Sequence, residues 1–563
     1  MGFAIYRRHW PLLGALLINI MLKACLLYAG VVPFNADEAV VALMARHILQ
    51  GERPVFFYGQ AYLGSLDAWL IAGAFGLLGE SVLVIRLAQS ALYLGVIATT
   101  YGLGLKIYSS RWVASAAALF LAAPTVLVTL YTTATLGGYG EVLLIGNILL
   151  LMTLRLADGT TRAKRERSRR RGCTRRAWLG LGFLAGLGFW GFPLIGVYLI
   201  PIVIYLLAAR RWRILDWLVC GGGFAVGAAP WLWFAVTASA ATLAELSGSA
   251  IAGASSSHPV FAAFQHLFNF LLLGLTVIWG LRPPWSARFL ALPLAPFALA
   301  MNMAVITFVL RITRSGPARP QSPIWVKRWL LLGVSLTLTA AFILTPFGAD
   351  PSGRYFLPLA APGALLMAEM LAGLSARQRR TRPAREASPE RSRRGWLANG
   401  LALGVVVFNI WGTAQSAADF PPGLTTQFDQ VAQVDQRDLP AVMQFLREQG
   451  ETRGYTNYWV EFPLAFLSGE ELLYAARLPY HLNFNYTTRY NRYPPYARAV
   501  EASPQAAYIT TLHPPLDERL RAGLQALGVA FEEKQIGDFH IFYALSRKVV
   551  PEELGLGTDC CPK

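Results

Sequence analysis

Long apolar runs, separated by short polar and charged segments, occupy most of the first 415 residues. A helix needs about 20 apolar residues to cross about 30 Å of hydrocarbon. On this rule we expect membrane spans near residues 11–32, 81–105, 111–132, 137–156, 214–237, 286–310, 329–347, 354–374 and 396–415. The run 178–209 is too long for one span, so we expect it to cross twice, as a short hairpin. Nine single spans and this hairpin predict an all-α membrane domain with about eleven crossings.

Basic residues are concentrated between the apolar runs. The segments Arg155–Arg176 and Arg377–Arg394 contain ten and eight Lys or Arg residues, with two acidic residues each. Short loops of this kind stay cytoplasmic, which places the N-terminus inside and the C-terminus outside. Because a span at 261–281 would move the basic group Arg311–Arg328 outside, we expect 261–281 to lie along, or dip into, the outer surface.

Composition supports a polytopic membrane protein surrounded by lipid. Of 563 residues, 55% are hydrophobic and only 15% are charged, whereas soluble domains carry about 25% charged residues. The net charge of +18 lies mostly in the basic loops. These loops lack the interleaved aromatic residues of a nucleic-acid surface, so we expect no nucleic-acid partner.

Two segments are expected outside the membrane. After residue 415 the apolar runs shorten and charges mix, which divides the chain into a membrane domain at 1–415 and a small extracytoplasmic α/β domain at 416–563. Expected strands are Thr452–Trp459, Ala507–Thr511 and Phe539–Ala544, and expected helices include Leu439–Gln449 and Leu516–Leu527. The other segment is the first outside loop, at 32–80.

The first outside loop contains two adjacent carboxylates, Asp37 and Glu38. Apolar residues at helical spacing follow them, so we expect a helix capped by Asn35 or Asp37 that ends near Gly51. A second apolar stretch, 62–78, should lie along the interface. Acidic residues favour a helix N-terminus through the macrodipole alone. However, ionisable groups near hydrocarbon are costly and usually functional.

Five motifs resemble bacterial GT-C glycosyltransferases, the polytopic enzymes related to protein O-mannosyltransferases and to the lipid A aminoarabinose transferase. The motifs are NADEA at 35–39, FFYGQAYLGSLDAWL at 56–70, GFWGFP at 188–193, GRYFLP at 353–358 and YWVEFPLAFLSGE at 458–470. The resemblance implies a sugar donor on a polyprenyl phosphate and transfer, with inversion, at the outer face of the cytoplasmic (plasma) membrane. It also implies a catalytic carboxylate in the first outside loop, which matches Asp37, with Glu38 in support.

Transfer of this kind needs a base and a cation. A carboxylate can take the proton of an acceptor hydroxyl as it attacks the anomeric carbon, and the phosphate leaving group needs a positive partner. Arg354, in an expected outside turn, is the candidate because guanidinium pairs bidentately with phosphate. A salt bridge to Asp350 is the alternative role for Arg354. Tyr355 could stack on sugar or pack against lipid.

Further candidates for substrate binding lie in the outside segments. They are Tyr58, Gln60, Asp67, Tyr139, Glu141 and His258, each with a scaffold, capping or solvated role as the alternative. Oligosaccharyltransferases of the same broad fold use a divalent ion held by several acids. No DxD-type cluster occurs here, so we expect no cofactor and no metal, with a divalent ion as the alternative.

The sequence leaves two other functions open. A flippase or transporter of lipid-linked sugars would place charges along a path through the spans, whereas here the acids lie in the outside loop. A polymerase or ligase with a diphosphate-linked donor would need the same base and cationic site. The sugar and the acceptor, whether lipid, glycan or protein, leave no trace in the sequence.

Overall fold

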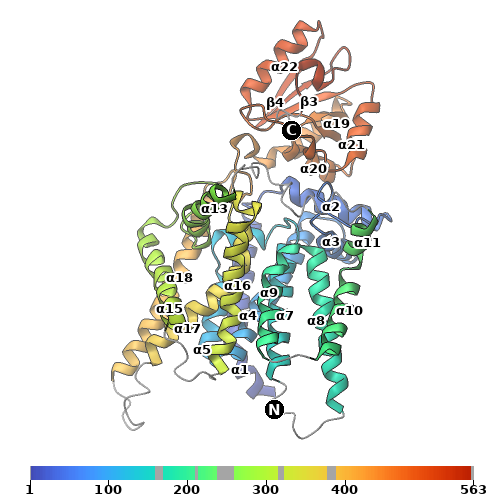
Figure 1. The fold of residues 1–563 in the computed structure, drawn as a ribbon. Helices are drawn as coiled ribbons and strands as arrows, with labels where there is room; N and C mark the ends of the chain where they lie inside the picture. The colour runs from blue at the N-terminus through green and yellow to red at the C-terminus, as the bar shows by residue number, and fades with distance from the viewer. Residues whose placement is uncertain are drawn as a thin grey trace.

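The chain folds into a tall helical bundle with a small α/β domain at one end. The computed structural model describes residues 2–158, 169–209, 213–237, 259–314, 323–350, 352–376 and 389–558. The N-terminus lies at the end of the bundle opposite the α/β domain (Figure 1). This arrangement agrees with the predicted fold class, while the domain boundary at residue 415 stays a prediction.

The bundle is that of a multi-pass membrane protein. Its long helices are α1 (Gly2–Tyr28), α4 (Val82–Tyr108), α7 (Tyr139–Asp158), α8 (Arg169–Gly191), α15 (Ala295–Arg314), α16 (Pro323–Leu344), α17 (Ala360–Ala376) and α18 (Pro389–Ala418). Among the described residues, eight helical segments are long and apolar enough to cross a membrane; they include Pro259–Ile278 and do not include α8. The bent pair α10 (Ile214–Gly227) and α11 (Ala229–Thr237) makes a ninth if it is counted as one span. The number of eleven crossings stays a prediction.

Prolines divide two of the expected apolar runs. Pro124 lies between α5 (Arg111–Ala122) and α6 (Val126–Tyr131), where one span was expected. The run 178–209 is broken after α8 and continues, through a short 3-10 turn that begins at Pro193, into α9 (Gly196–Ala208). Proline lacks the backbone N–H that a helix interior requires, which explains breaks at these places.

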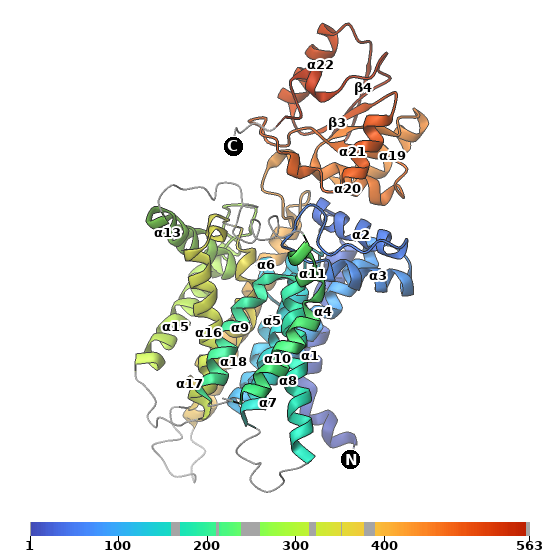
Figure 2. The ribbon, with the colours of Figure 1, turned by 45° about the vertical axis from the view of Figure 1, so that its right-hand side comes forward.

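The segment expected at the outer surface begins with α13 (Pro259–Phe268), which continues through a π-helical stretch into α14 (Leu275–Ile278). Its length and hydropathy would also suit a span. In both ribbon views α13 lies at the end of the bundle that carries the α/β domain (Figures 1 and 2). There Asn269 Nδ2 donates to Gly348 O (2.9 Å), just beyond the end of α16.

The first outside loop forms two helices, as expected. α2 (Ala36–Leu49) begins after Asn35, whose side chain accepts a hydrogen bond from Glu38 N at 3.1 Å, and α3 is Leu66–Leu78. In both views α2 lies directly beneath α20 (Tyr458–Leu467) of the α/β domain (Figure 2). The first outside loop therefore forms the surface on which the α/β domain rests.

The α/β domain is built on a five-stranded sheet with strand order β2-β1-β3-β5-β4. Its strands are β1 (Arg453–Thr456), β2 (Leu473–Ala476), β3 (Ala507–Thr511), β4 (Glu532–Ile536) and β5 (Phe539–Tyr543). β1 is parallel to β2 and β3, whereas β5 is antiparallel to β3 and β4. Side chains alternate between two cores, one containing Tyr508 and Phe542 and the other Ile509 and Ile541.

Four helices complete the α/β domain: α19 (Leu439–Glu448), α20, α21 (Pro494–Ala502) and α22 (Pro514–Ala526). The strand expected at Thr452–Trp459 ends at Thr456. The reason is that the Asn457 side chain accepts a hydrogen bond from Trp459 N and caps α20. The motif YWVEFPLAFL is therefore a helix that faces the first outside loop.

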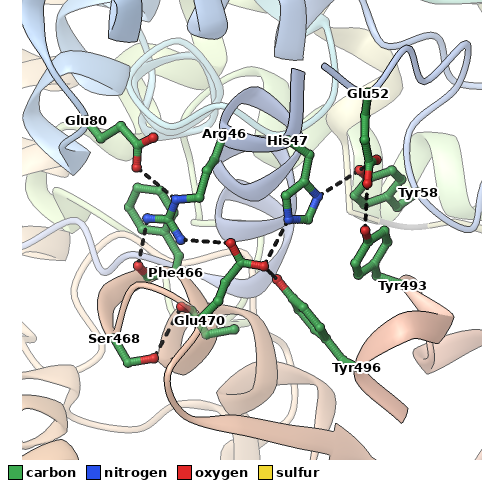
Figure 3. A network of polar contacts seen from close by, with 11 residues as sticks. Arg46, His47, Glu52, Tyr58, Glu80, Phe466, Ser468, Glu470, Tyr493 and Tyr496 are labelled. Atoms are coloured by element: carbon green, nitrogen blue, oxygen red, sulfur yellow. Dashed lines mark hydrogen bonds and ion pairs between the residues drawn. The ribbon is translucent and has the colours of Figure 1, made fainter. Parts of the chain in front are cut away.

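A polar network joins the two domains (Figure 3). Glu470, just after α20, lies 3.0 Å from His47 Nε2 and 3.5 Å from Arg46 Nη1, both on α2. Tyr496 of α21 donates to the same carboxylate at 2.7 Å. We call these four residues the docking cluster. It holds the α/β domain against the helix that carries Asp37.

Candidate active site

A polar cavity of about 800 Å³ lies where the α/β domain meets the membrane domain. Segments from both domains line it. The membrane domain contributes Asp37, Phe57, Gln60, Tyr62, Leu63, Leu136, Gly137, Tyr139, Phe192, Ala349, Asp350, Arg354 and Tyr355. The α/β domain contributes Phe428, Tyr480, His481, Thr487, Arg489, Tyr490 and Arg492. The cavity thus brings together residues that are up to 455 positions apart, from 37 to 492.

Asp37 is half-buried at the start of α2 and lines this cavity. The hydroxyl of Tyr458, at the start of α20, donates to Asp37 Oδ1 at 2.5 Å. Burial and the nearby Asp37 carboxylate raise the pKa of Tyr458 well above its ordinary value, so the hydroxyl keeps its proton. One oxygen of Asp37 is therefore held by the α/β domain.

Arg492 supports this contact from the α/β domain. Its guanidinium lies 5.6 Å from the ring centre of Tyr458 and donates to Gly59 O at 3.3 Å. With the Gln60 amide in its better-bonded orientation, the Gln60 oxygen accepts from both terminal nitrogens of Arg492 at 2.9 Å. Gln60 is therefore a cavity residue that holds an arginine.

Arg354 lines the membrane-domain side of the cavity. Gly353 turns the chain with φ +82°, a conformation that favours glycine, and the 3-10 helix η6 (Arg354–Leu359) follows. Arg354 Nη2 pairs with Asp350 Oδ2 at 2.6 Å, and the guanidinium carbon lies 5.1 Å from the Tyr355 ring centre. The salt bridge to Asp350 is thus present, at a guanidinium that also faces the cavity.

Glu38 does not line the cavity. It is fully buried and forms an ion pair with Arg86 of α4 at 2.6 Å. Burial raises the pKa of Glu38 to about 7, although the Arg86 charge and the Thr135 N–H act in the opposite direction. The carboxylate that follows Asp37 in the sequence therefore joins α2 to the bundle.

Three other candidates lie away from the cavity lining. Tyr58 donates to Glu52 at 2.6 Å and stacks on Tyr493, with ring centres 4.6 Å apart. Asp67 is buried, accepts from Gln89 at 2.9 Å and interacts with Glu141, which is also buried. Tyr139 does line the cavity, whereas His258 lies outside the described residues.

A second cavity lies on the other side of η6. It has a volume of about 350 Å³ and is lined largely by apolar residues of α5, α6, α15, α17 and α18, together with Phe356 and Leu357 of η6. Tyr355 faces the polar cavity and Phe356 the apolar one. A polar and an apolar compartment therefore share one short wall next to Arg354.

The described part of the chain contains no group of three or more His, Cys, Asp or Glu side chains placed to hold a metal ion. Asp37 and Asp350 are the acidic residues of the polar cavity, and Asp350 is paired with Arg354. The absence of a metal stays a prediction.

Several cavity residues were not expected from the sequence. Tyr458 belongs to a recognised motif, but its hydrogen bond to Asp37 depends on how the domains dock. The segment 480–493, YHLNFNYTTRYNRY, supplies most of the α/β wall. Its alternation of tyrosine and arginine is the signal that could have indicated a binding surface.

Comparison with solved structures gives this chain the GT-C fold, as the motifs predicted. No protein-family model matches the sequence, and no curated protein matches it. Among solved structures, ArnT from Cupriavidus metallidurans bound to undecaprenyl phosphate matches with a TM-score of 0.51 and 14% identity. That match covers 93% of this chain and 97% of ArnT.

Archaeal oligosaccharyltransferase structures match as well. AglB from Archaeoglobus fulgidus, in complex with an inhibitory peptide and a dolichol-phosphate, has a TM-score of 0.53 and 13% identity over 95% of this chain and 74% of that chain. The apo oligosaccharyltransferase of the same organism has a TM-score of 0.52 and 13% identity over 90% and 70%. At these identities the matches establish the fold.

Proposed function

We propose that this chain is a glycosyltransferase of the plasma membrane. It moves a sugar from a polyprenyl-phosphate donor to an acceptor hydroxyl at the outer face. The observation that carries the proposal is that Asp37 and Arg354, a base and a phosphate partner, line one cavity of about 800 Å³. The fold match to ArnT bound to undecaprenyl phosphate supports a donor of the same kind.

Asp37 acts as the general base. Tyr458 holds its Oδ1 atom, so Oδ2 takes the proton of the acceptor hydroxyl as the hydroxyl oxygen attacks the anomeric carbon. A new C–O bond forms while the bond from the anomeric carbon to the phosphate oxygen breaks. The electron pair of that bond leaves with the polyprenyl phosphate. Because this is a single displacement, the anomeric configuration inverts.

Arg354 binds the donor phosphate and stabilises the charge that grows on it. Guanidinium donates to two phosphate oxygens at once, and the Asp350 contact orients it. The apolar cavity on the other side of η6 accepts the nearest isoprene units of the lipid. The donor thus spans the η6 wall, with its sugar on the polar side and its chain on the apolar side.

Glu38 is a positioning residue in this proposal. Its pair with Arg86 fixes the first turn of α2, and thereby the direction in which Asp37 points. Gln60 has a similar role, because it holds Arg492 beside Tyr458.

A transfer assay tests the proposal. Purified parent protein and an Asp37→Asn variant are incubated with radiolabelled polyprenyl-phosphate sugars and membrane acceptors, and transferred label is counted. We expect transfer by the parent that is lost in the variant. Binding of the donors without transfer of any of them would overturn the proposal and favour a flippase.

A further inference from the structure

The α/β domain contributes two arginines to the polar cavity, and their surroundings differ. Arg492 is engaged by Gln60, Gly59 and the Tyr458 ring. Arg489 is exposed and lines the cavity. Within the described ranges of the chain, its guanidinium forms no hydrogen bond and no ion pair. Arg489 is therefore the cavity arginine that is available to a ligand.

The acidic residues that line the cavity are engaged elsewhere and form no ion pair with Arg489. Three arginines line the cavity, together with two aspartates. Asp350 forms an ion pair with Arg354. Asp37 accepts a hydrogen bond from the hydroxyl of Tyr458, whose ring lies next to Arg492. A donor with one phosphate, bound at Arg354, does not supply a second anion for Arg489.

Aromatic rings of the α/β domain line the cavity together with Arg489. Tyr480 and Tyr490 line the cavity with ring centres 5.0 Å apart, and His481 lies 4.2 Å from Tyr480. Tyrosine rings offer rigid amphipathic contact area at small entropic cost, which suits the apolar faces of a sugar ring. A cation that lines the same cavity as such rings suits a saccharide that carries a negative group.

We propose that Arg489, Tyr480 and Tyr490 form an acceptor subsite for an anionic saccharide, which carries a phosphate or a carboxylate. This inference rests on the proposed function. A second phosphate on a diphosphate-linked donor would present the same chemistry. The origin of Arg489 favours the acceptor, because Arg489 belongs to the α/β domain, whereas Arg354 and the lining of the apolar cavity belong to the membrane domain.

Chemical protection tests the subsite without any transfer reaction. The purified full chain is treated with phenylglyoxal, and modification of each arginine is followed by peptide mass spectrometry with glucose 6-phosphate, glucuronate or glucose present. At ten times its dissociation constant a ligand leaves about one-eleventh of a site free. We therefore expect about tenfold slower modification of Arg489 with either anionic sugar, and no change with glucose.

Arg498, exposed on α21 and not part of the cavity lining, is the matched control. Equal protection of Arg489 and Arg498, or no protection of Arg489, would overturn the subsite. Protection of Arg489 in a protein that transfers no sugar would support the subsite while contradicting the proposed function.

A transfer experiment separates the two sources of the anion. The parent, Arg489→Gln and Arg489→Lys are assayed with monophosphate and diphosphate donors, and labelled product is applied to an anion exchanger. We expect the parent to make a retained, anionic product from the monophosphate donor.

In Arg489→Gln the acceptor KM should rise about tenfold or more at unchanged kcat, because a hydrogen bond to a charged group is lost. Arg489→Lys should restore part of this loss. A neutral product, formed only from a diphosphate donor, would overturn the acceptor assignment.

Discussion

Two neighbouring carboxylates, Asp37 and Glu38, serve different partners. Successive residues of a helix point about 100° apart, so Asp37 faces the polar cavity while Glu38 faces Arg86 inside the bundle. The sequence shows both acids at the right place, but only the orientation of α2 separates the base from the structural ion pair.

Replacing Glu38 by Gln should destabilise the protein. The substitution leaves the buried Arg86 guanidinium without its carboxylate, and breaking a buried pair costs about 3–5 kcal/mol. We expect thermal unfolding of the purified Glu38→Gln variant at a clearly lower temperature than Asp37→Asn, whose side chain is only half-buried. Equal midpoints of thermal unfolding for both variants would contradict the assignment of Glu38 to a structural ion pair with Arg86.

Replacing Tyr458 by Phe should slow transfer without weakening donor binding. The variant loses the hydrogen bond that holds Asp37 Oδ1, and a hydrogen bond to a charged group contributes about 1.5–3 kcal/mol, roughly a 10- to 100-fold effect. We expect kcat to fall by this factor at unchanged donor KM, measured by initial rates. Tyr543→Phe, which removes a similar bond to Glu532 in the α/β domain, is the control that should keep the parent rate.

At the scale of elements, η6 separates the polar from the apolar cavity, and α17 follows it. Gly363 of α17 lines the apolar cavity, and a Cβ atom added there would meet no other heavy atom within 4 Å. A Cβ atom therefore meets no steric obstacle at Gly363, and the rest of a larger side chain would extend into space that we assign to the lipid.

We expect Gly363→Phe to fold as the parent does and to bind the donor more weakly. Loss of contacts with two or three buried CH₂ groups, at about 0.8 kcal/mol each, corresponds to roughly 10- to 50-fold in donor affinity. The same change at Gly373, also open and on α17 but not part of the cavity lining, is the control. Equilibrium binding of a labelled polyprenyl phosphate measures the difference, and equal weakening in both variants would contradict the lipid assignment.

The ionisation of Glu470 in the docking cluster makes the contact between the two domains depend on pH. Burial would raise the pKa of Glu470, but hydrogen bonds from His47 and Tyr496 outweigh it and lower the pKa to about 2 from an ordinary value of 4.5. Docking therefore favours the ionised carboxylate. Its contribution is complete above about pH 4.5 and is lost as the pH falls towards 2.

Hydrogen exchange of α20 and α21 measures this docking. We expect slow exchange in the parent down to about pH 4.5, after correction for intrinsic rates, and a rise below it. At neutral pH, Glu470→Gln should exchange roughly tenfold faster, because a hydrogen bond to a charged group contributes about 1.5 kcal/mol or more. Glu471→Gln, whose partner Arg447 lies within the α/β domain, should resemble the parent. Unchanged exchange in Glu470→Gln would show that the cluster does not hold the domains.

At the scale of the whole molecule, hydropathy was enough to predict a helical membrane bundle that is followed by a small α/β region. Asn35 and the apolar spacing behind it predicted α2 because capping is a local interaction. The residue pattern predicted that β1 would continue to Trp459, whereas Asn457 caps the helix α20 at this place. Local signals also could not place Arg489 and Arg492, since their segment reaches the cavity only after the α/β domain docks.

The central claim is that Asp37 and Arg354 act on the same sugar phosphate in one cavity. Single-turnover transfer at saturating donor, measured together with donor binding, tests it most directly. We predict that Asp37→Asn binds the donor as the parent does but transfers it about 10²- to 10⁴-fold more slowly, whereas Arg354→Gln loses donor affinity. Transfer by Asp37→Asn at the parent rate, or full donor affinity in Arg354→Gln, would contradict the account.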